Sequence, residues 1–337
     1  MEETNVVILA AGRGSRMQSR NPNHSKVAYP ILDKPIINYV LDTVKTLNPT
    51  NVVVVVGYGG EVTKSLVEKD ALVVWQHVIN GTGGAVLQAK PLLKDKKGTT
   101  LVVYGDTPLI TSEMLENIFA YHVKNNNDLT IVTMVLENPT GYGRIIREYK
   151  SNKILSIRED KDCADDEKEI TEVNTGVCVV DNEKLFQYLE KITPNNAQHE
   201  CYLSNIVELF VEDDLKVGTF VCEDAEEMFS INDQFQLSYA TKVMRKRINN
   251  KLMLSGVSIE DPDTAYISPG IIIGKDTIIK PNTTITGTTI IGENNVIGPN
   301  TYIKNTKIGS DNIIHSSWIV DDEIGNKQKL FDYRKFE

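Results

Sequence analysis

The stretch LAAGRGSRM, residues 9–17, places two glycines and two arginines directly after the apolar run NVVI. Gly12 and Gly14 would let backbone N–H groups approach an anion closely. The side chains of Arg13 and Arg16 would supply the positive charge that the backbone lacks. Shortly afterwards come two further cations, Arg20 and Lys26. The stretch therefore predicts a phosphate-binding loop, and the alternative is a glycine turn with solvated arginines.

Two common phosphate-binding motifs do not fit this stretch. The dinucleotide fingerprint needs a third glycine where the chain has Met17, and the GxxxxGK[ST] loop is absent. The next predicted strand, in VVVVVGYGG, also lacks an acidic residue at its end. A nicotinamide-dependent oxidoreductase, one alternative function, is therefore disfavoured.

A glutamine and a glycine-rich turn follow another predicted strand. Gln76 offers an amide donor and acceptor, and the turn NGTGG exposes backbone at Gly81 and Thr82. Such groups suit the Watson–Crick edge of a pyrimidine. An ordinary glycine turn is the alternative.

Asp106 ends the predicted strand TLVVYGD, where its carboxylate would point into a ligand crevice. Mg²⁺ is commonly held by one or two carboxylates together with substrate phosphates. Asp106 is thus a candidate metal ligand, or else a turn aspartate. Asn232 precedes a long helical stretch, where it could be the helix N-cap.

Strand-like and helical stretches alternate up to about residue 225. NVVILAA (5–11) and NVVVVVGY (51–58) have the β-branched composition of buried strands. PIINYVLDTVKTL (35–47) and SEMLENIFAYHVKNN (112–126) have helical periodicity, the second with Ser112 as a plausible cap. This order predicts an α/β fold with a Rossmann-like, doubly wound mixed sheet, mostly parallel. Ligands bind such sheets at the carboxyl ends of the strands.

A six-residue repeat begins near residue 255. Isoleucine recurs at positions 267, 273, 279, 285, 291, 297 and 303; the frame slips by one and continues at Ile308, Ile314 and Val320. This period is typical of a solenoid in which each hexapeptide forms one short face. We expect an α/β domain over residues 1–232, an arm helix over 233–254, a short parallel β-helix of about three coils over 255–325, and a tail over 326–337.

The composition is that of an ordinary globular protein, with 41% hydrophobic and 24% charged residues. A net charge of −10 argues against general nucleic-acid binding, and no apolar run reaches membrane-spanning length. Four separated cysteines without a CxxC pair predict reduced thiols in a cytoplasmic protein. No His/Cys cluster suggests a transition-metal site.

Eight motifs in order carry a resemblance to a known family. They are LAAGRGSRM with Lys26, WQHVINGTGGA (75–85), VVYGDTPLI (102–110), PTGYGRI (139–145), IREDKD (157–162), EVNTGV (172–177), NNAQHECYLSNIV (195–207) and INDQFQL (231–237). The chain resembles the sugar-nucleotidyltransferases. Over nearly its whole length it resembles the bifunctional N-acetylglucosamine-1-phosphate uridylyltransferase/glucosamine-1-phosphate acetyltransferase family, which ends in a left-handed β-helix.

The resemblance implies that UTP and N-acetylglucosamine 1-phosphate give pyrophosphate and UDP-N-acetylglucosamine, a cell wall precursor, with Mg²⁺ as cofactor. It assigns catalysis to Arg16, Lys26 and Asp106, and the metal to Asp106 and Asn232. It assigns nucleotide binding to Leu9, Ala10, Ala11, Gly12, Arg13, Gly14, Gln76, Gly81 and Thr82. It assigns the sugar to Tyr104, Gly143, Glu159 and Asn174. It also implies a homotrimer assembled through the β-helix.

The chain departs from the family pattern at three places. Ser204-Asn205 stands where the family usually has Thr-Asp, and Asn232-Asp233-Gln234 stands where it usually has Asn-Asn-Arg. The family's β-helix is also longer and binds acetyl-coenzyme A there, so we expect no acetyltransferase activity from these 337 residues. Another sugar 1-phosphate as substrate, or a non-catalytic sugar-nucleotide-binding paralogue, stays open as an alternative.

Overall fold

The computed structural model describes residues 3–19, 25–194, 196 and 198–336, so Arg20 lies outside the described residues. The chain divides into two compact units. The first, the catalytic unit, comprises residues 1–29 and 35–236, and the second, the β-helix unit, comprises residues 30–34 and 237–337. No helix in the described ranges is both long and apolar enough to cross a membrane.

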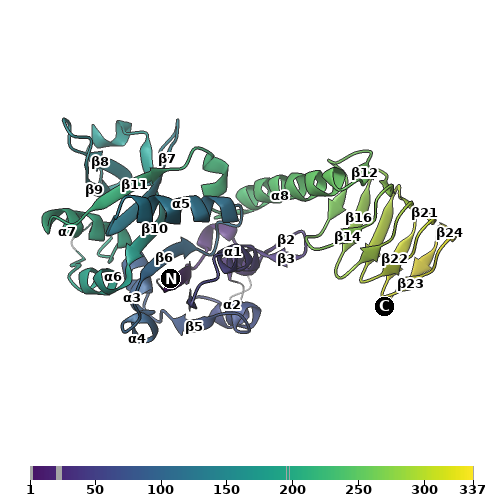
Figure 1. Ribbon diagram of the computed structural model, residues 1–337, viewed down its shortest axis with the longest axis horizontal. Coiled ribbons are helices and arrows are strands. Elements are labelled where there is room, and N and C mark those ends of the chain that lie inside the picture. Colours follow the sequence, from purple (N-terminus) through teal and green to yellow (C-terminus); the bar gives the residue numbers. More distant parts are fainter. Residues whose placement is uncertain (1–2, 20–24, 195, 197, 337) are drawn as a thin grey trace. The chain divides into compact units, whose positions relative to one another are not determined.

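A mixed sheet forms the centre of the catalytic unit (Figure 1), with strand order β11-β7-β10-β6-β1-β4-β5. Strands β1, β4, β5 and β6 are parallel, whereas β10 runs antiparallel to both β6 and β7. Strands β8 and β9 pair beside β10. The bounds are β1 Thr4–Ala10, β4 Asn51–Val56, β5 Leu72–Trp75, β6 Thr99–Tyr104, β7 Leu129–Val135, β8 Arg144–Arg147, β9 Ile154–Arg158, β10 Glu172–Asp181 and β11 Val217–Val221.

Helices cover both faces of this sheet because alternate strand residues point to opposite sides. Val6 and Ile8 of β1 pack in the core beneath α1, α2 and α5, whereas Val7 and Leu9 pack in the core beneath α3, α6 and α7. The helices are α1 Ile36–Lys45, α2 Gly60–Val67, α3 Thr82–Leu87, α4 Lys90–Leu93, α5 Ser112–Lys124, α6 Asn182–Leu189 and α7 Ile206–Glu212. The predicted doubly wound mixed sheet is confirmed.

The start of α5 differs from the expectation by one residue. Thr111, not Ser112, is the N-cap, and its hydroxyl accepts from the backbone N–H of Met114 at 3.1 Å. Thr111 has extended backbone, as a cap requires, and Ser112 is the first helical residue.

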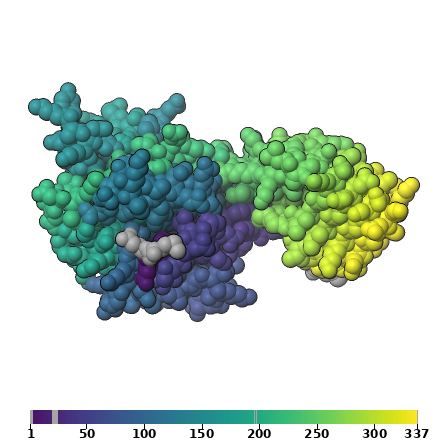
Figure 2. All heavy atoms as spheres, viewed as in Figure 1, coloured from purple at the N-terminus to yellow at the C-terminus, as the bar shows by residue number. Residues whose placement is uncertain are grey.

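The β-helix unit includes most of α8, Gln234–Leu254, which is followed by three parallel sheets of very short strands. Figure 2 shows the successive coils in order from green to yellow. The sheets are β12-β15-β18-β21-β24, β13-β16-β19-β22-β25 and β14-β17-β20-β23. Their strands are β12 Ser258–Ile259, β13 Tyr266–Ile267, β14 Ile272–Ile273, β15 Ile278–Ile279, β16 Thr283–Thr286, β17 Ile290–Ile291, β18 Val296–Ile297, β19 Thr301–Lys304, β20 Lys307–Ile308, β21 Ile313–His315, β22 Trp318–Val320, β23 Glu323–Ile324, β24 Lys329–Phe331 and β25 Arg334–Lys335. A two-stranded ribbon, β2 Pro30–Ile31 with β3 Lys34–Pro35, lies earlier in the chain.

The inward isoleucines form one continuous core, as the six-residue period predicts. Ile285 pairs with Ile303, and Ile279 with Ile297, so each coil places an isoleucine on the one before it. All four of these side chains are fully buried. The short parallel strands with hexapeptide spacing agree with the expected left-handed β-helix.

The repeat extends further than the period in the sequence suggests. Ile303 pairs with Ile319 rather than lying above Val320, so the frame slips again, and Ile324 continues the core. Residues 326–337, expected to form a separate tail, instead include β24 and β25, which pair with β21 and β22. The later coils have fewer residues in their turns, so the six-residue period disappears from the sequence although the coils continue to stack.

Candidate active site

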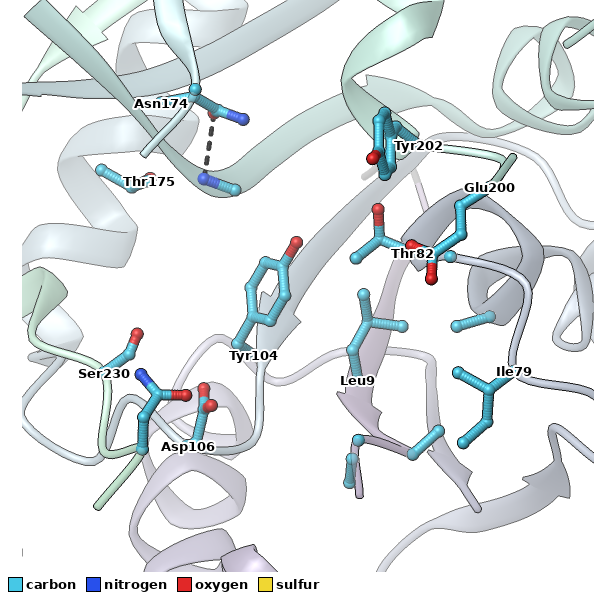
Figure 3. A pocket seen from close by; sticks show the side chains of 18 of the residues that line it. Leu9, Ile79, Thr82, Tyr104, Asp106, Asn174, Thr175, Glu200, Tyr202 and Ser230 are labelled. Atoms are coloured by element: carbon cyan, nitrogen blue, oxygen red, sulfur yellow. Dashed lines mark hydrogen bonds between the residues drawn. The ribbon is translucent and has the colours of Figure 1, made fainter. Parts of the chain in front are cut away.

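A cavity of about 450 Å³ opens in the catalytic unit, where β1 and β6 end. In Figure 3, Asp106 and Ser230 lie at one end, Ile79 and Glu200 at the other, and Tyr104 between them. The predicted site residues that line it are Leu9, Ala10, Ala11, Gly12, Lys26, Gln76, Gly81, Thr82, Tyr104, Asp106, Gly143, Glu159, Asn174 and Asn232. These residues come from seven of the eight motifs, and the cavity lining also includes residues of the eighth, NNAQHECYLSNIV.

Three predicted residues, Arg13, Gly14 and Arg16, do not line the cavity. The guanidinium of Arg13 lies over the ring of Tyr58, 5.4 Å from its centre, and Arg16 is exposed. Gly14 has a left-handed backbone and leads into the 3-10 helix Ser15–Met17. A Cβ atom there would lie 2.7 Å from the Cβ atom of Lys26. In this conformation the glycine serves close packing, and the two arginines remain outside the cavity.

An ion pair occupies the Asp106 end of the cavity. The ammonium of Lys26 contacts the carboxylate of Asp106 and donates to Asn232 Oδ1 at 2.9 Å. The side chains of Lys26 and Asp106 are only 11% and 12% exposed. The backbone N–H of Ile231 donates to the Asp106 carbonyl at 2.9 Å and thereby places Asn232 beside Asp106. Residues from three remote segments thus share one charged cluster.

The oxygen donors of this cluster fit a hard cation. Asp106 Oδ1 is buried, and no other described residue donates a hydrogen bond to it. A buried carboxylate oxygen without a donor carries a large desolvation cost unless a cation or ligand contacts it. Asn232 adds an amide oxygen, the other ligand type that Mg²⁺ accepts. Among the described residues no group of three His, Cys, Asp or Glu side chains is arranged to hold a metal ion, so a metal here would depend on these two residues and on its substrate.

The alternative role of Asn232 as a helix cap is not observed. Asp233 caps α8, because its Oδ1 accepts from the backbone N–H of Gln236 at 2.8 Å. The side chain of Asn232 is thereby free to point at Lys26. The Asp233 charge, a departure from the family pattern, is engaged at a helix N-terminus, where negative charge is favourable.

Residues 76–83, here called the Gln76 loop, form the opposite end of the cavity. Gln76 is 4% exposed, and its Nε2 donates to Asn80 Oδ1 and to the Gly81 carbonyl, both at 3.1 Å. Both amide hydrogens are therefore used within the loop, which leaves Oε1 as the acceptor offered to a ligand. Gly81 has φ of 96°, a conformation that favours glycine.

Glu159 and Asn174 line a third side of the cavity. Burial raises the pKa of the Glu159 carboxyl above its usual range, while a hydrogen bond from Ser204 Oγ at 2.7 Å acts in the opposite direction. Asn174 Oδ1 accepts from the backbone N–H of Gly176 at 2.9 Å, the dashed line in Figure 3. This bond fixes the amide so that its NH₂ group can donate to a ligand. Ser204, a departure from the family pattern, thus directly orients Glu159.

Sequence reasoning missed several lining residues, including Glu200, Tyr202 and Ser230. Tyr202 is 7% exposed, and burial raises the pKa of its phenol to about 12. Glu200 and Tyr202 stand inside the motif NNAQHECYLSNIV, so the resemblance pointed to this segment without singling them out. The first and third residues of that motif, 195 and 197, lie outside the described residues.

Comparison with known proteins places this site in a family. Residues 6–157 match the MobA-like NTP transferase domain. The bifunctional protein GlmU of Enterococcus faecalis is 42% identical over 97% of this chain and 67% of its own length. That of Lactobacillus helveticus is 43% identical over 96% of this chain and 66% of its own length, and that of Thermoanaerobacter pseudethanolicus 43% over 98% and 71%. The chain belongs to the GlmU family.

The GlmU assignment explains the division into two units. The catalytic unit contains the NTP transferase match and is a nucleotidyltransferase domain. The match to GlmU proteins continues through the β-helix unit, and the chain spans about two thirds of their length. Membership of this family decides against the nicotinamide-dependent oxidoreductase.

Proposed function

We propose that this GlmU-family chain transfers a uridylyl group from UTP to N-acetylglucosamine 1-phosphate, giving UDP-N-acetylglucosamine and pyrophosphate. The observation that carries the proposal is a single cavity whose three parts differ in chemistry. A charged cluster of Lys26, Asp106 and Asn232 suits phosphates, the Gln76 loop suits a base, and Glu159 with Asn174 suits a sugar.

The reaction needs alignment and charge neutralisation more than proton transfer. The sugar phosphate is already an anion at neutral pH, and its oxygen attacks the α-phosphorus of UTP as the bond to pyrophosphate breaks. The barrier is mainly repulsion between anions, so fixed positive charge and correct placement lower it. Lys26 supplies such a charge inside the cavity. Arg16 lies outside it in the conformation described, so its expected role on the leaving pyrophosphate remains a prediction.

Asp106 and Asn232 are the residues that would hold Mg²⁺. When bound, the ion would supply Lewis-acid polarisation and a template for the two phosphate groups. The buried Asp106 Oδ1 without a donor supports this assignment.

Base and sugar selection follow from the direction of the hydrogen bonds. Gln76 Oε1 can accept from uracil N3–H, whereas N3 of cytosine carries a lone pair that would face it. Glu159 can accept from sugar hydroxyls, and the Asn174 NH₂ can donate to the N-acetyl carbonyl. The second pair distinguishes N-acetylglucosamine from glucose, which lacks that carbonyl.

The decisive experiment measures pyrophosphate release over a matrix of UTP, CTP, ATP and GTP against several sugar 1-phosphates, with and without Mg²⁺. We expect turnover with UTP and N-acetylglucosamine 1-phosphate that depends on Mg²⁺. Preference for another sugar phosphate would support that alternative substrate. Binding of UDP-N-acetylglucosamine without any turnover would identify a non-catalytic paralogue.

Two finer expectations belong to the same proposal. Residues 1–337 should show no acetyl transfer from acetyl-coenzyme A to glucosamine 1-phosphate, because the family uses a longer β-helix for that step. The β-helix unit should assemble the protein as a trimer, because a short solenoid buries little core by itself. Light scattering should then give three times the chain mass of 37.7 kDa. A mass near one chain would contradict the assembly.

A further inference from the structure

The Gln76 loop is joined to a segment that lies more than a hundred residues further along the chain. Cys201 donates its backbone N–H to the Asn80 carbonyl at 2.8 Å, and its own carbonyl accepts from the Gly83 N–H at 2.8 Å. The Leu203 N–H donates to the Thr82 hydroxyl at 2.9 Å. Within the described part of the chain, these are the hydrogen bonds that tie residues 199–203 to sequence-remote residues.

The two segments are packed without space between their backbones. A Cβ atom at Gly81 would lie 2.5 Å from the Cys201 carbonyl oxygen, and one at Gly83 would lie 2.9 Å from the same atom. Real Cβ atoms do not come this close to an oxygen without moving it. A displacement of the Gln76 loop must therefore displace residues 201–203 as well.

The two segments meet at one end of the cavity and reach different groups from there. The Gln76 loop carries Gly81 and Thr82 at the base end. Residues 200–204 carry the buried Tyr202 and then Ser204, whose hydroxyl orients Glu159 on the sugar side. The hydrogen bonds between residues 80–83 and 201–203, here called the bridge, therefore connect the residues that would contact the nucleotide with those that would contact the sugar.

The hydroxyl of Thr82 is already engaged in the contact with residues 201–203. Its oxygen accepts from the Leu203 N–H at 2.9 Å. A nucleotide would meet the backbone of Thr82, while its side chain holds the bridge.

We propose that Thr82 is a positioning residue that couples the two substrate sites, so that a nucleotide on the Gln76 loop increases the affinity for the sugar phosphate. A nucleotide that orders the Gln76 loop also orders residues 201–204 through the bridge. The sugar phosphate then binds to residues that are already in position. Such coupling is reciprocal and is commonly worth 5- to 150-fold in affinity, on the order of 1–3 kcal/mol. This inference rests on the proposed function and adds a link between its two substrates.

The test measures binding rather than turnover. N-acetylglucosamine 1-phosphate is titrated calorimetrically into the full chain with Mg²⁺, with and without saturating α,β-methylene-UTP, which cannot release pyrophosphate. We expect at least about 5-fold tighter sugar-phosphate binding in the presence of the nucleotide analogue. In Thr82→Val, which removes the acceptor of the Leu203 N–H, this ratio should fall close to one. Thr82→Ser, which keeps the hydroxyl, should restore it.

Two further variants separate coupling from simple damage. Gly83→Ala lies outside the cavity lining and pushes on the Cys201 carbonyl, so it should also lower the ratio, and it carries the test if Thr82→Val does not fold. Ser204→Ala should weaken sugar-phosphate binding with and without the analogue and leave the ratio unchanged. A ratio of one in the wild-type protein, or an unchanged ratio in Thr82→Val, would overturn the coupling. Failure of both ligands to bind would instead overturn the proposed function.

Discussion

The two units of the chain use glycine for different purposes. In the β-helix unit, Gly274, Gly292 and Gly309 lie on successive coils, one above the other. A Cβ atom on each would come within 2.9 Å of the backbone of the next coil. The same contact is thus repeated on three successive coils, which resemble one another.

In the catalytic unit the close contacts of such glycines follow no repeat. A Cβ atom at Gly83 would meet the Cys201 carbonyl, and one at Gly176 would lie 2.3 Å from the ring of Tyr104. Gly81 and Gly83 share the Cys201 carbonyl, but that contact belongs to a single place in the fold. The difference indicates that a substitution in the catalytic unit can impair function by disturbing one specific contact. A substitution in the β-helix unit should instead lower stability in proportion to the buried apolar side chain that it removes.

The largest effect should follow loss of the Asp106 carboxylate. Asp106→Asn should lower kcat by on the order of 10²-fold or more, because the site loses its main anionic group for a cation and Lys26 loses its partner. Asp128 provides a matched control, because it pairs with Lys184 away from the cavity. Asp128→Asn should keep turnover near the wild-type level, as measured by pyrophosphate release. Mg²⁺-dependent turnover that survives in Asp106→Asn would exclude the metal assignment.

The next largest effect concerns base selection. Gln76→Leu should lower kcat/KM for UTP by about 10²-fold, because a site built to pair with a polar edge is left without its acceptor. Activity with CTP should change much less, so the preference between the two should collapse. Gln88→Leu is the control, since Gln88 also donates to a backbone carbonyl, that of Gly84, but does not line the cavity. If Gln76→Leu keeps its preference for UTP, another group reads the base.

Neighbouring isoleucines in one strand test the β-helix unit. Ile291 is 1% exposed and Ile290 is 43% exposed, although both belong to β17. Ile291→Ala should lower the free energy of unfolding of this unit by about 2–5 kcal/mol, because it opens a cavity in the isoleucine core. Ile290→Ala should cost much less. Calorimetry should show the difference while kcat stays at the wild-type value, and equal losses in the two variants would contradict the stacked core.

The smallest effect should appear at the last coil. Burial opposes ionisation of Asp322, but the ammonium of Lys335 at 2.6 Å, the Glu323 N–H and the Tyr333 hydroxyl together lower the pKa of its carboxyl. The resulting stabilisation is present above the ordinary carboxyl pKa and is lost as the pH falls through the lowered value. The hydrogen-exchange protection factors of residues 329–335, which correct for the intrinsic effect of pH, should therefore fall in acid. In Asp322→Asn this part of the pH dependence should be absent.

Several features of the fold followed from the sequence because they depend on local patterns. The strand and helix alternation predicted the doubly wound sheet, and the recurring isoleucines predicted the β-helix. The ends of the predicted strands also pointed to Asp106 and Gln76. Each of these signals requires only the order of residues within a short window.

Other features were decided only by the tertiary structure, because they depend on which remote segments meet. The sequence could not show that Asp233 rather than Asn232 caps α8, since both residue types suit a cap. Nor could it show that Ile319 rather than Val320 continues the core, because shorter turns shift the frame while the parallel pairing is maintained. The bridge from Thr82 to Leu203 leaves no pattern in either segment, because backbone groups make most of it and every residue type has them. Local periodicity therefore determined the two architectures, and contacts between distant backbone groups determined how the site is held.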